Sequence, residues 1–156
     1  EIYNINIRAQ YFLTQALVPE MVKQGGGAIV NISSIHAYAA MPGHSVYAGT
    51  KGAIVSYTRE LALELAPHKI RVNGIAPGFI LIEKNVDSMP PGFDFGKVGK
   101  ILPAGRVGTP WDVARLAIFL ASDEAGYILG QTIQLDGGHS IVLPLVDQML
   151  AAMNQQ

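Results

Sequence analysis

Two short segments, an apolar run and a second predicted strand, constrain the fold of this chain most. Residues 28–32 lie between three glycines and two serines, and residues 70–76 end at Pro77-Gly78. Runs of this length and composition are typical of buried strands in a parallel sheet. A long helical pattern over residues 45–66 separates them. This strand–helix–strand order predicts two parallel strands of one sheet.

Three further segments extend the alternation. Apolar residues at helical spacing predict a helix over 3–22, and residues 131–135 alternate like a third strand. A helix is predicted to begin with Thr109 as its N-cap, Pro110 at its first position and Asp112 completing a capping box. The sequence therefore predicts an α/β fold, with three parallel strands and helices on both faces.

The connector over residues 79–108 is long and rich in proline, glycine and phenylalanine. Compact domains rarely hold such a connector unless it covers a binding site. We therefore expect it to act as a lid, with Phe79 contacting a substrate, and we expect residues 141–156 to form an amphipathic tail. Three parallel strands leave one sheet edge bare, so we expect further strands before Glu1.

Composition argues against several classes of function. Eleven basic and twelve acidic residues give a net charge of −1, so we expect no nucleic-acid partner. The absence of cysteine excludes disulfides, thiolate ligands and thiol nucleophiles. The four histidines show no ligand spacing, so we expect no metal site. No apolar run reaches the roughly 18 residues of a membrane span, and no signal peptide is evident, so we expect a cytoplasmic protein.

Tyr47 and Lys51 stand four residues apart on the predicted helix over 45–66, which puts both side chains on one face. A free tyrosine has a pKa near 10, too high for a base at neutral pH. A lysine ammonium about 5 Å away is expected to lower that pKa by about two units. The pair is then suited to acid–base chemistry. The spacing alone also fits an ordinary helix-surface pair.

Other polar residues gather where the predicted strands end. Ser33 and Ser34 follow the first strand, and Pro77-Gly78 follow the second. Ligands of open parallel sheets bind beyond these carboxyl ends. We expect the Ser34 hydroxyl to contact a substrate oxygen together with Tyr47, although a plain serine-rich turn fits too. His36 and His44 flank the same loop and are candidates for contact with a polar substrate.

Taken together, the motifs resemble those of the short-chain dehydrogenase/reductase family. The matching stretches are NISS at 31–34, YAGTK at 47–51, RVNGIAPG at 71–78, RVG at 106–108 and GQ at 130–131 through DGG at 136–138. The resemblance spans nearly the whole chain except the lid and the tail. It implies that residues 1–156 are the C-terminal part of one Rossmann-type domain, without the glycine-rich nucleotide-binding half.

The resemblance implies a role for each matching residue. Tyr47 would be the general acid/base, and Lys51 would lower its pKa and bind the nicotinamide ribose. Ser34 would polarise an alcohol or carbonyl substrate. Asn6 would hold a water molecule in the proton relay, with Asn4 as a competing candidate. The residues implied to line the nicotinamide of NAD or NADP are Pro77, Gly78 and Ile80.

Departures from the family pattern limit what the chain can do by itself. Ile82 stands where the family usually has a threonine that binds the nicotinamide carboxamide. Gly25-Gly26-Gly27 precedes a strand and does not link a strand to a helix, so it cannot present a helix N-terminus to a phosphate. We therefore expect the chain as given to be inactive alone and unable to bind a dinucleotide tightly.

Substrate, partners and alternatives complete the interpretation. Some sugar dehydrogenases of the family carry a similar Ser-Ser-x-His stretch, which implies a sugar or polyol. The two long helices carry more apolar surface than three strands can cover, and the family pairs them in dimers or tetramers, so we expect a homo-oligomer.

Two alternatives stay open: a serine hydrolase using Ser34 with a histidine, and a degenerate relative serving as an oligomerisation or binding module.

Overall fold

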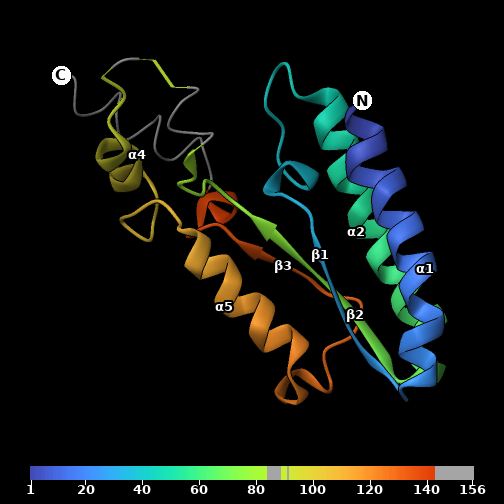
Figure 1. Cartoon of the computed structure of the whole chain (residues 1–156). Coiled ribbons are helices and arrows are strands. Elements are labelled where there is room, and N and C mark those ends of the chain that lie inside the picture. The colour runs from blue at the N-terminus through green and yellow to red at the C-terminus, as the bar shows by residue number, and fades with distance from the viewer. Residues whose placement is uncertain (84–88, 91, 143–156) are drawn as a thin grey trace.

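The computed structural model describes residues 1–83, 89–90 and 92–142. Its three strands are β1 (Gly27–Ile32), β2 (Ile70–Pro77) and β3 (Thr132–Leu135). They form one parallel sheet with β2 in the middle. Helices α1 (Ala9–Lys23) and α2 (Ser45–Leu65) lie side by side on one face, and α5 (Pro110–Ala121) covers the other (Figure 1). The predicted α/β fold is confirmed.

Alternation along β2 divides the core between the two faces. Ile70 and Val72 pack against α2, whereas Ile75 packs against Leu120 of α5. All three β2 side chains are fully buried, as expected for the central strand of a parallel sheet covered on both faces. The core of the sheet is therefore built on both sides of β2.

Arg71 ties the sheet to the end of α5. Its guanidinium group donates hydrogen bonds to the carbonyls of Leu120 (2.7 Å), Ser122 (2.9 Å), Ala121 and Ala125. The last carbonyls of a helix lack partners within the helix, and a nearby cation also complements the helix dipole. Arg71 thus fixes the far end of α5 against the start of β2.

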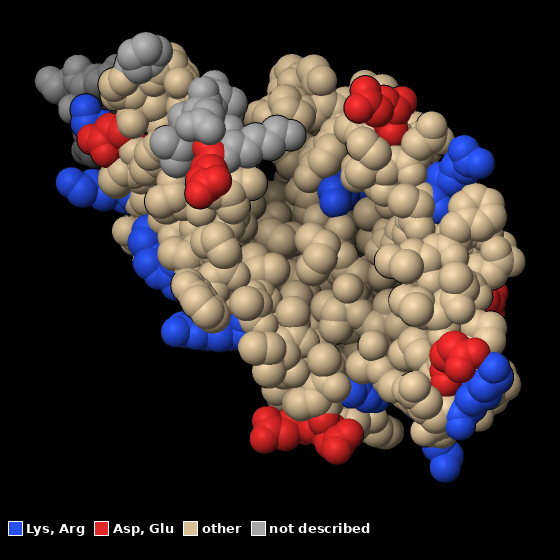
Figure 2. Space-filling model, viewed as in Figure 1, with Lys and Arg blue, Asp and Glu red and all other residues tan. Residues whose placement is uncertain are grey.

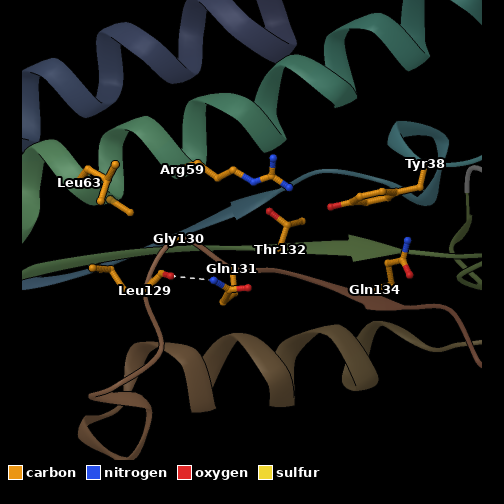
Figure 3. Close-up of a pocket in the computed structure, with 9 residues that line it drawn as sticks. Tyr38, Arg59, Leu63, Leu129, Gly130, Gln131, Thr132 and Gln134 are labelled. Atoms are coloured by element: carbon orange, nitrogen blue, oxygen red, sulfur yellow. Dashed lines mark hydrogen bonds between the residues drawn. The ribbon is translucent and has the colours of Figure 1, made fainter.

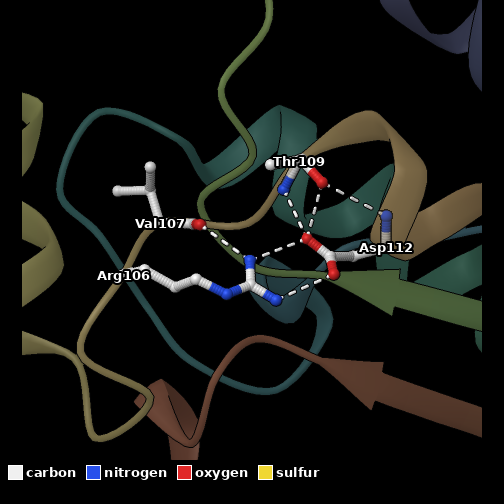
Figure 4. A network of polar contacts seen from close by, with 4 residues as sticks. All are labelled: Arg106, Val107, Thr109 and Asp112. Carbon is white, nitrogen blue, oxygen red and sulfur yellow. Dashed lines mark hydrogen bonds and ion pairs between the residues drawn. The ribbon is translucent and has the colours of Figure 1, made fainter.

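The start of α5 has the predicted capping box (Figure 4). The backbone N–H and the hydroxyl of Thr109 each donate to the Asp112 carboxylate at 2.7 Å, and the Asp112 N–H donates to Thr109 Oγ1 at 3.4 Å. Arg106 donates two hydrogen bonds of 2.8 Å to the same carboxylate. The bonds from Arg106, and then those from Thr109, hold the pKa of Asp112 well below its usual range.

We expect Thr109→Ala to lower the free energy of unfolding by about 1 kcal/mol, because the first turn of α5 loses its hydroxyl cap. Urea unfolding followed by circular dichroism measures the change. Thr109→Ser keeps the hydroxyl and serves as the matched control. Equal unfolding midpoints for the alanine and serine variants would contradict the capping role.

The segment between β2 and α5 contains a helix that the sequence pattern did not predict. Helix α4 spans Phe95–Ile101, and Asp94 caps it by accepting from the N–H groups of Gly96 and Lys97. Its two glycines weaken helical propensity, which hides it from pattern analysis. The two ends of the segment are joined, since Leu81 N donates to Gly108 O at 2.8 Å and Gly108 N to Phe79 O at 3.0 Å.

Short helical turns complete the described chain. A π-helical turn, η1 (Asn4–Arg8), precedes α1. The 3₁₀ turns are η2 (Ile35–Ala37), η3 (Ala66–His68), η4 (Asp123–Ala125) and η5 (His139–Ile141). Most of the predicted tail, residues 143–156, lies outside the described residues, as do 84–88 and 91 of the predicted lid. None of the helices in the described ranges has the length and hydropathy of a membrane span.

Charged side chains are sparse on the face shown in Figure 2, and basic and acidic groups are scattered around its margin. No continuous basic area appears on this face. The face is hollowed between the side that carries α4 and the side that carries α1 and α2. The carboxyl ends of the strands point toward the end of the molecule that carries α4 (Figure 1).

Candidate active site

The end of β1 is fixed to both of its neighbours through Ser33. The Ser33 N–H donates to Ile75 O on β2 at 2.7 Å, and its hydroxyl donates to Lys51 O on α2 at 2.8 Å. Both polar groups of Ser33 are therefore used to position the chain. The hydroxyl proton of Ser34, the next residue, has no acceptor among the described residues.

Tyr47 and Lys51 approach each other on the first turns of α2, as their spacing predicts. The Lys51 ammonium lies 5.6 Å from the centre of the Tyr47 ring and donates to Ile32 O at 3.0 Å. Burial lowers the pKa of Lys51. The lysine is thus held between the last residue of β1 and the phenol ring.

Ser34 joins this group through the loop that follows β1. Its side chain is buried, and Oγ accepts a hydrogen bond from the His36 backbone N–H at 3.2 Å, which caps η2. The His36 ring then meets the Tyr47 ring edge-on at 5.4 Å. One short turn therefore links Ser34 to the neighbourhood of Tyr47.

Asn6 reaches α2 from the π-helical turn at the start of the chain. Its Nδ2 donates to Thr50 Oγ1 at 3.0 Å, and the Thr50 hydroxyl donates to Tyr47 O at 2.7 Å. Asn4, the competing candidate, is exposed and has no side-chain hydrogen bond among the described residues. The contacts favour Asn6, and π-helical turns often occur at functional sites.

The two loop histidines lie beside the tyrosine. The His36 and His44 rings are 5.1 Å apart, and His44 Nδ1 lies 3.1 Å from Pro42 O. Burial, and secondarily the charge of His44, lowers the pKa of His36. His36 Nδ1 is buried and has no hydrogen-bond partner among the described residues.

The end of β2 forms the other side of the sheet rim. Gly78 N donates to Leu135 O at 3.0 Å, and a Cβ on Gly78 would lie 2.6 Å from Asp136 Cβ. Glycine is therefore needed here for the approach of β3, whatever ligand the rim receives. Phe79 stacks on Phe95 of α4 at 6.1 Å, and Ile80 pairs with Gly108.

The predicted residues thus fall into two neighbouring groups. Tyr47, Lys51, Ser34, Asn6, His36 and His44 are connected through the contacts above. Pro77 ends β2, and Gly78, Phe79 and Ile80 follow it; Phe79 and Ile80 line a small pocket of about 140 Å³. Ile82, which replaces the threonine usual in the family, is exposed.

Sequence analysis missed several residues that support the site. Thr50 connects Asn6 to Tyr47, and Gln10, Asn31 and Thr58 form a chain of hydrogen bonds of 2.7 and 2.9 Å beneath it. Asn31 stood within an apolar run, and its polarity was the one available signal. A cavity of about 300 Å³ beside the Ser34 loop was also missed; it is lined by Ile35, Ala39, Ile101, Pro103, His139, Ser140 and Val142.

A second cavity, of about 480 Å³, lies between α2 and β3 (Figure 3). Arg59, Tyr38 and Thr132 project toward it in Figure 3, and Thr132 Oγ1 is buried with no partner among the described residues. None of the predicted site residues lines this cavity. It is therefore separate from the candidate active site.

The arrangement does not favour the hydrolase alternative. Ser34 Oγ accepts from a backbone N–H, and no imidazole nitrogen hydrogen-bonds it in the part of the chain that the structure describes. A serine nucleophile needs a base within hydrogen-bond reach. No group of three His, Asp or Glu side chains within the described ranges is placed to hold a metal ion.

Comparisons with known proteins agree with this arrangement of strands and helices. The sequence pattern of the family described as enoyl-(acyl carrier protein) reductase matches residues 1–140. The chain is 41% identical to the 3-oxoacyl-[acyl-carrier-protein] reductase FabG of Thermotoga maritima, over 88% of this chain and 55% of that protein. It is 40% identical to an NAD-dependent glycerol dehydrogenase of Listeria innocua, over 88% of this chain and 54% of the relative.

Among solved structures, a gluconate 5-dehydrogenase from Burkholderia cenocepacia, in complex with NADP and tartrate, superposes with a TM-score of 0.82. It is 33% identical, and the match covers 90% of this chain and 55% of that one. The chain belongs to the short-chain dehydrogenase/reductase family. It spans about half the length of the curated relatives that it matches.

Proposed function

We propose that the native protein containing this chain is an NAD(P)-dependent oxidoreductase that interconverts an alcohol and a carbonyl compound. The observation that carries the proposal is the Lys51 ammonium, held by Ile32 O at 3.0 Å and lying 5.6 Å from the Tyr47 ring. A positive charge held beside the Tyr47 ring at the carboxyl end of β1 supports a proton-transferring role for this tyrosine. Family membership and the names of its relatives support the same activity.

The donors of Lys51 fit the nicotinamide ribose of NAD or NADP. An ammonium group has three N–H donors, and one of these bonds Ile32 O. The other two have no partner among the described residues and suit the two ribose hydroxyls. Pro77, Gly78 and the backbone of Ile80 would line the nicotinamide, which when bound accepts or supplies the hydride. Ile82 offers the carboxamide no side-chain hydrogen bond.

The remaining residues would handle the substrate oxygen and its proton. Ser34 Oγ already accepts from His36 N–H, so its own proton is available to the substrate oxygen. Tyr47 would exchange a proton with that oxygen, while the Lys51 charge stabilises negative charge developing on the phenol. The side-chain oxygen of Asn6, Oδ1, accepts no hydrogen bond within the described residues and would hold the relay water.

We propose that the native protein acts in the cytoplasm. We also propose that its substrate is a sugar or polyol. The loop between β1 and α2 supports a sugar or polyol because Ser34, His36 and His44 all lie on it close to Tyr47. We also propose that residues 79–108 act as a substrate-binding lid. Phe79 stacks on Phe95 and Phe93 meets Phe95 edge-on, which supports this because the segment then carries a cluster of aromatic side chains.

Hydride transfer by the native protein tests the activity directly. We expect loss of NADH or NADPH absorbance when a panel of small ketones and ketoses is added, and the reverse reaction with the matching alcohols. No cofactor binding at millimolar NAD(P)H would contradict the proposal. That outcome would favour the non-enzymatic alternative, an oligomerisation or binding module.

We further propose that α1 and α2 pair with a second copy in a homo-oligomer. Five large apolar side chains on α1 are exposed: Tyr11, Phe12, Leu13, Leu17 and Val22. We expect Leu13→Glu to lower the molar mass measured by light scattering to that of a smaller assembly, because a charge would then lie in the contact. Ile101→Glu, on exposed α4, is the control. An unchanged mass in the Leu13 variant would contradict this interface.

A further inference from the structure

Thr50 is a fully buried polar residue in the turn of α2 between Tyr47 and Lys51, and the proposed proton transfer assigns it no part. Its hydroxyl makes two hydrogen bonds. Oγ1 lies 2.7 Å from Tyr47 O, in its own helix, and 3.0 Å from Nδ2 of Asn6, which belongs to η1. The hydroxyl therefore connects the turn that carries the proposed acid–base residue to the residue proposed to hold the relay water.

The direction of each bond of Thr50 follows from the number of protons available. A carbonyl oxygen can only accept, so the single proton of the Thr50 hydroxyl lies toward Tyr47 O. The lone pairs that remain on Oγ1 can only accept. The group that faces them from Asn6 must therefore donate, and this requires the NH₂ end of the amide.

The orientation of the Asn6 amide is thus set by Thr50. If the amide were turned over, Oδ1 would face an oxygen whose proton is already committed, and the contact would join two acceptors. In the observed orientation Oδ1 accepts no hydrogen bond within the described residues. An oxygen left in this way can accept from a water molecule, which is the part proposed for it in the proton relay.

A second threonine of α2 makes the same two bonds where no relay is proposed. Thr58 is fully buried, donates to Ile54 O at 2.8 Å and accepts from Asn31 Nδ2 at 2.9 Å. Here the other end of the amide is paired too, because Asn31 Oδ1 accepts from Gln10 Nε2 at 2.7 Å. The Asn6 amide differs in having its oxygen unpaired among the described residues. Thr58 is therefore the matched comparison for Thr50.

We propose that Thr50 is a positioning residue of the active site, whose hydroxyl holds the Asn6 amide so that Oδ1 is presented to the relay water. This inference rests on the proposed function. Thr50 contacts neither substrate nor cofactor in this arrangement and acts only through Asn6. Removing its hydroxyl should therefore slow proton transfer without weakening substrate binding.

The first test compares Thr50→Val and Thr50→Ser in the native protein. Valine keeps the shape of threonine and removes the hydroxyl, whereas serine keeps the hydroxyl. We expect Thr50→Val to lower kcat for carbonyl reduction about tenfold, the effect of one hydrogen bond of ordinary strength, with KM unchanged. The solvent deuterium isotope effect on kcat should rise, because proton transfer then limits the rate more strongly. Thr50→Ser should restore both values.

Three kinetic outcomes would overturn the inference. One is an unchanged kcat in Thr50→Val. Another is a kcat for Thr50→Ser as low as that for Thr50→Val, because the loss would then arise from packing of the methyl group. The third is a change confined to KM, because it would place Thr50 in substrate binding.

A second measurement separates this inference from the proposed function. The proton–nitrogen resonances of the Asn6 side-chain amide report its hydrogen bond without any turnover. In the wild type we expect one N–H of Asn6 to exchange with solvent more slowly than those of Asn4, which is exposed and has no side-chain hydrogen bond among the described residues. Thr50→Val should remove this protection, whereas Thr50→Ser and Thr58→Val should keep it.

The amide measurement decides the role of Thr50 even if the native protein transfers no hydride. In that case the proposed function would fail, while the exchange rates would still show whether Thr50 orients Asn6. Equal exchange rates for Asn6 and Asn4 in the wild type would overturn the inference. Protection of Asn6 that survived in Thr50→Val would overturn it as well.

Discussion

We expect Tyr47→Phe to lower kcat by roughly 10²- to 10⁴-fold, the usual contribution of a positioned acid–base group. The variant loses only the hydroxyl, so the ring contacts with Lys51 and His36 remain. Initial rates of NAD(P)H oxidation with a carbonyl substrate measure the effect. Thermal unfolding of the variant should match that of the wild type, because the lost group is not part of the buried core.

Tyr127→Phe is the matched control, since Tyr127 is fully exposed and lies at η4, the far end of α5. It should leave the rate unchanged. A Tyr47 variant that kept most of its activity would point away from acid–base catalysis by this residue. Retained activity on esters in place of carbonyl compounds would revive the Ser34 hydrolase interpretation.

The largest expected effect on stability comes from the centre of the sheet. Ile75 is fully buried on β2 against Leu120 and Ala125, and its carbonyl accepts the Ser33 N–H. We expect Ile75→Ala to lower the free energy of unfolding by about 2–5 kcal/mol, because it leaves a cavity where two strands and α5 meet. That is a large share of the 5–15 kcal/mol typical of a domain. Urea unfolding measures it.

Two variants calibrate this result. Ile75→Val removes one methylene group and should cost about 0.5–1.5 kcal/mol. Ile118→Ala removes an exposed isoleucine from α5 and should change stability by less than about 0.5 kcal/mol. If Ile75→Ala were no more destabilising than Ile118→Ala, the core would not be packed as described.

Much of the fold could be predicted because its signals are local. The apolar run before Ser33 predicts β1, and Thr109, Pro110 and Asp112 predict the start of α5 from adjacent residues alone. Helix α4 could not be predicted, because glycine at position 99 is required by a close contact with a part of the chain that follows the helix. A Cβ at that position would lie 3.0 Å from Arg106 Cα, a residue of the chain that returns past the helix.

The site follows the same division. Tyr47 and Lys51 share one helical turn, so their proximity follows from spacing. Thr50 looks like any helix residue, and its connection to Asn6 depends on a contact across 44 residues of sequence. The contact of His44 Nδ1 with Pro42 O and the burial of His36 Nδ1 depend on how the loop folds, which no pattern of residue types encodes.

The π-helical turn η1 (Asn4–Arg8) rotates the side chains before it relative to those of α1, because it contains one residue more than an α-helical turn. Ala9 N–H bonds Asn4 O, one residue further back than in an α-helix. Each residue of an α-helix turns the chain by about 100°. Deleting one residue from this stretch would therefore restore ordinary winding and swing the amide of Asn6 away from α2, with α1 itself left in place. The additional residue in the π-helical turn therefore directs the side-chain amide of Asn6 toward Thr50 on α2.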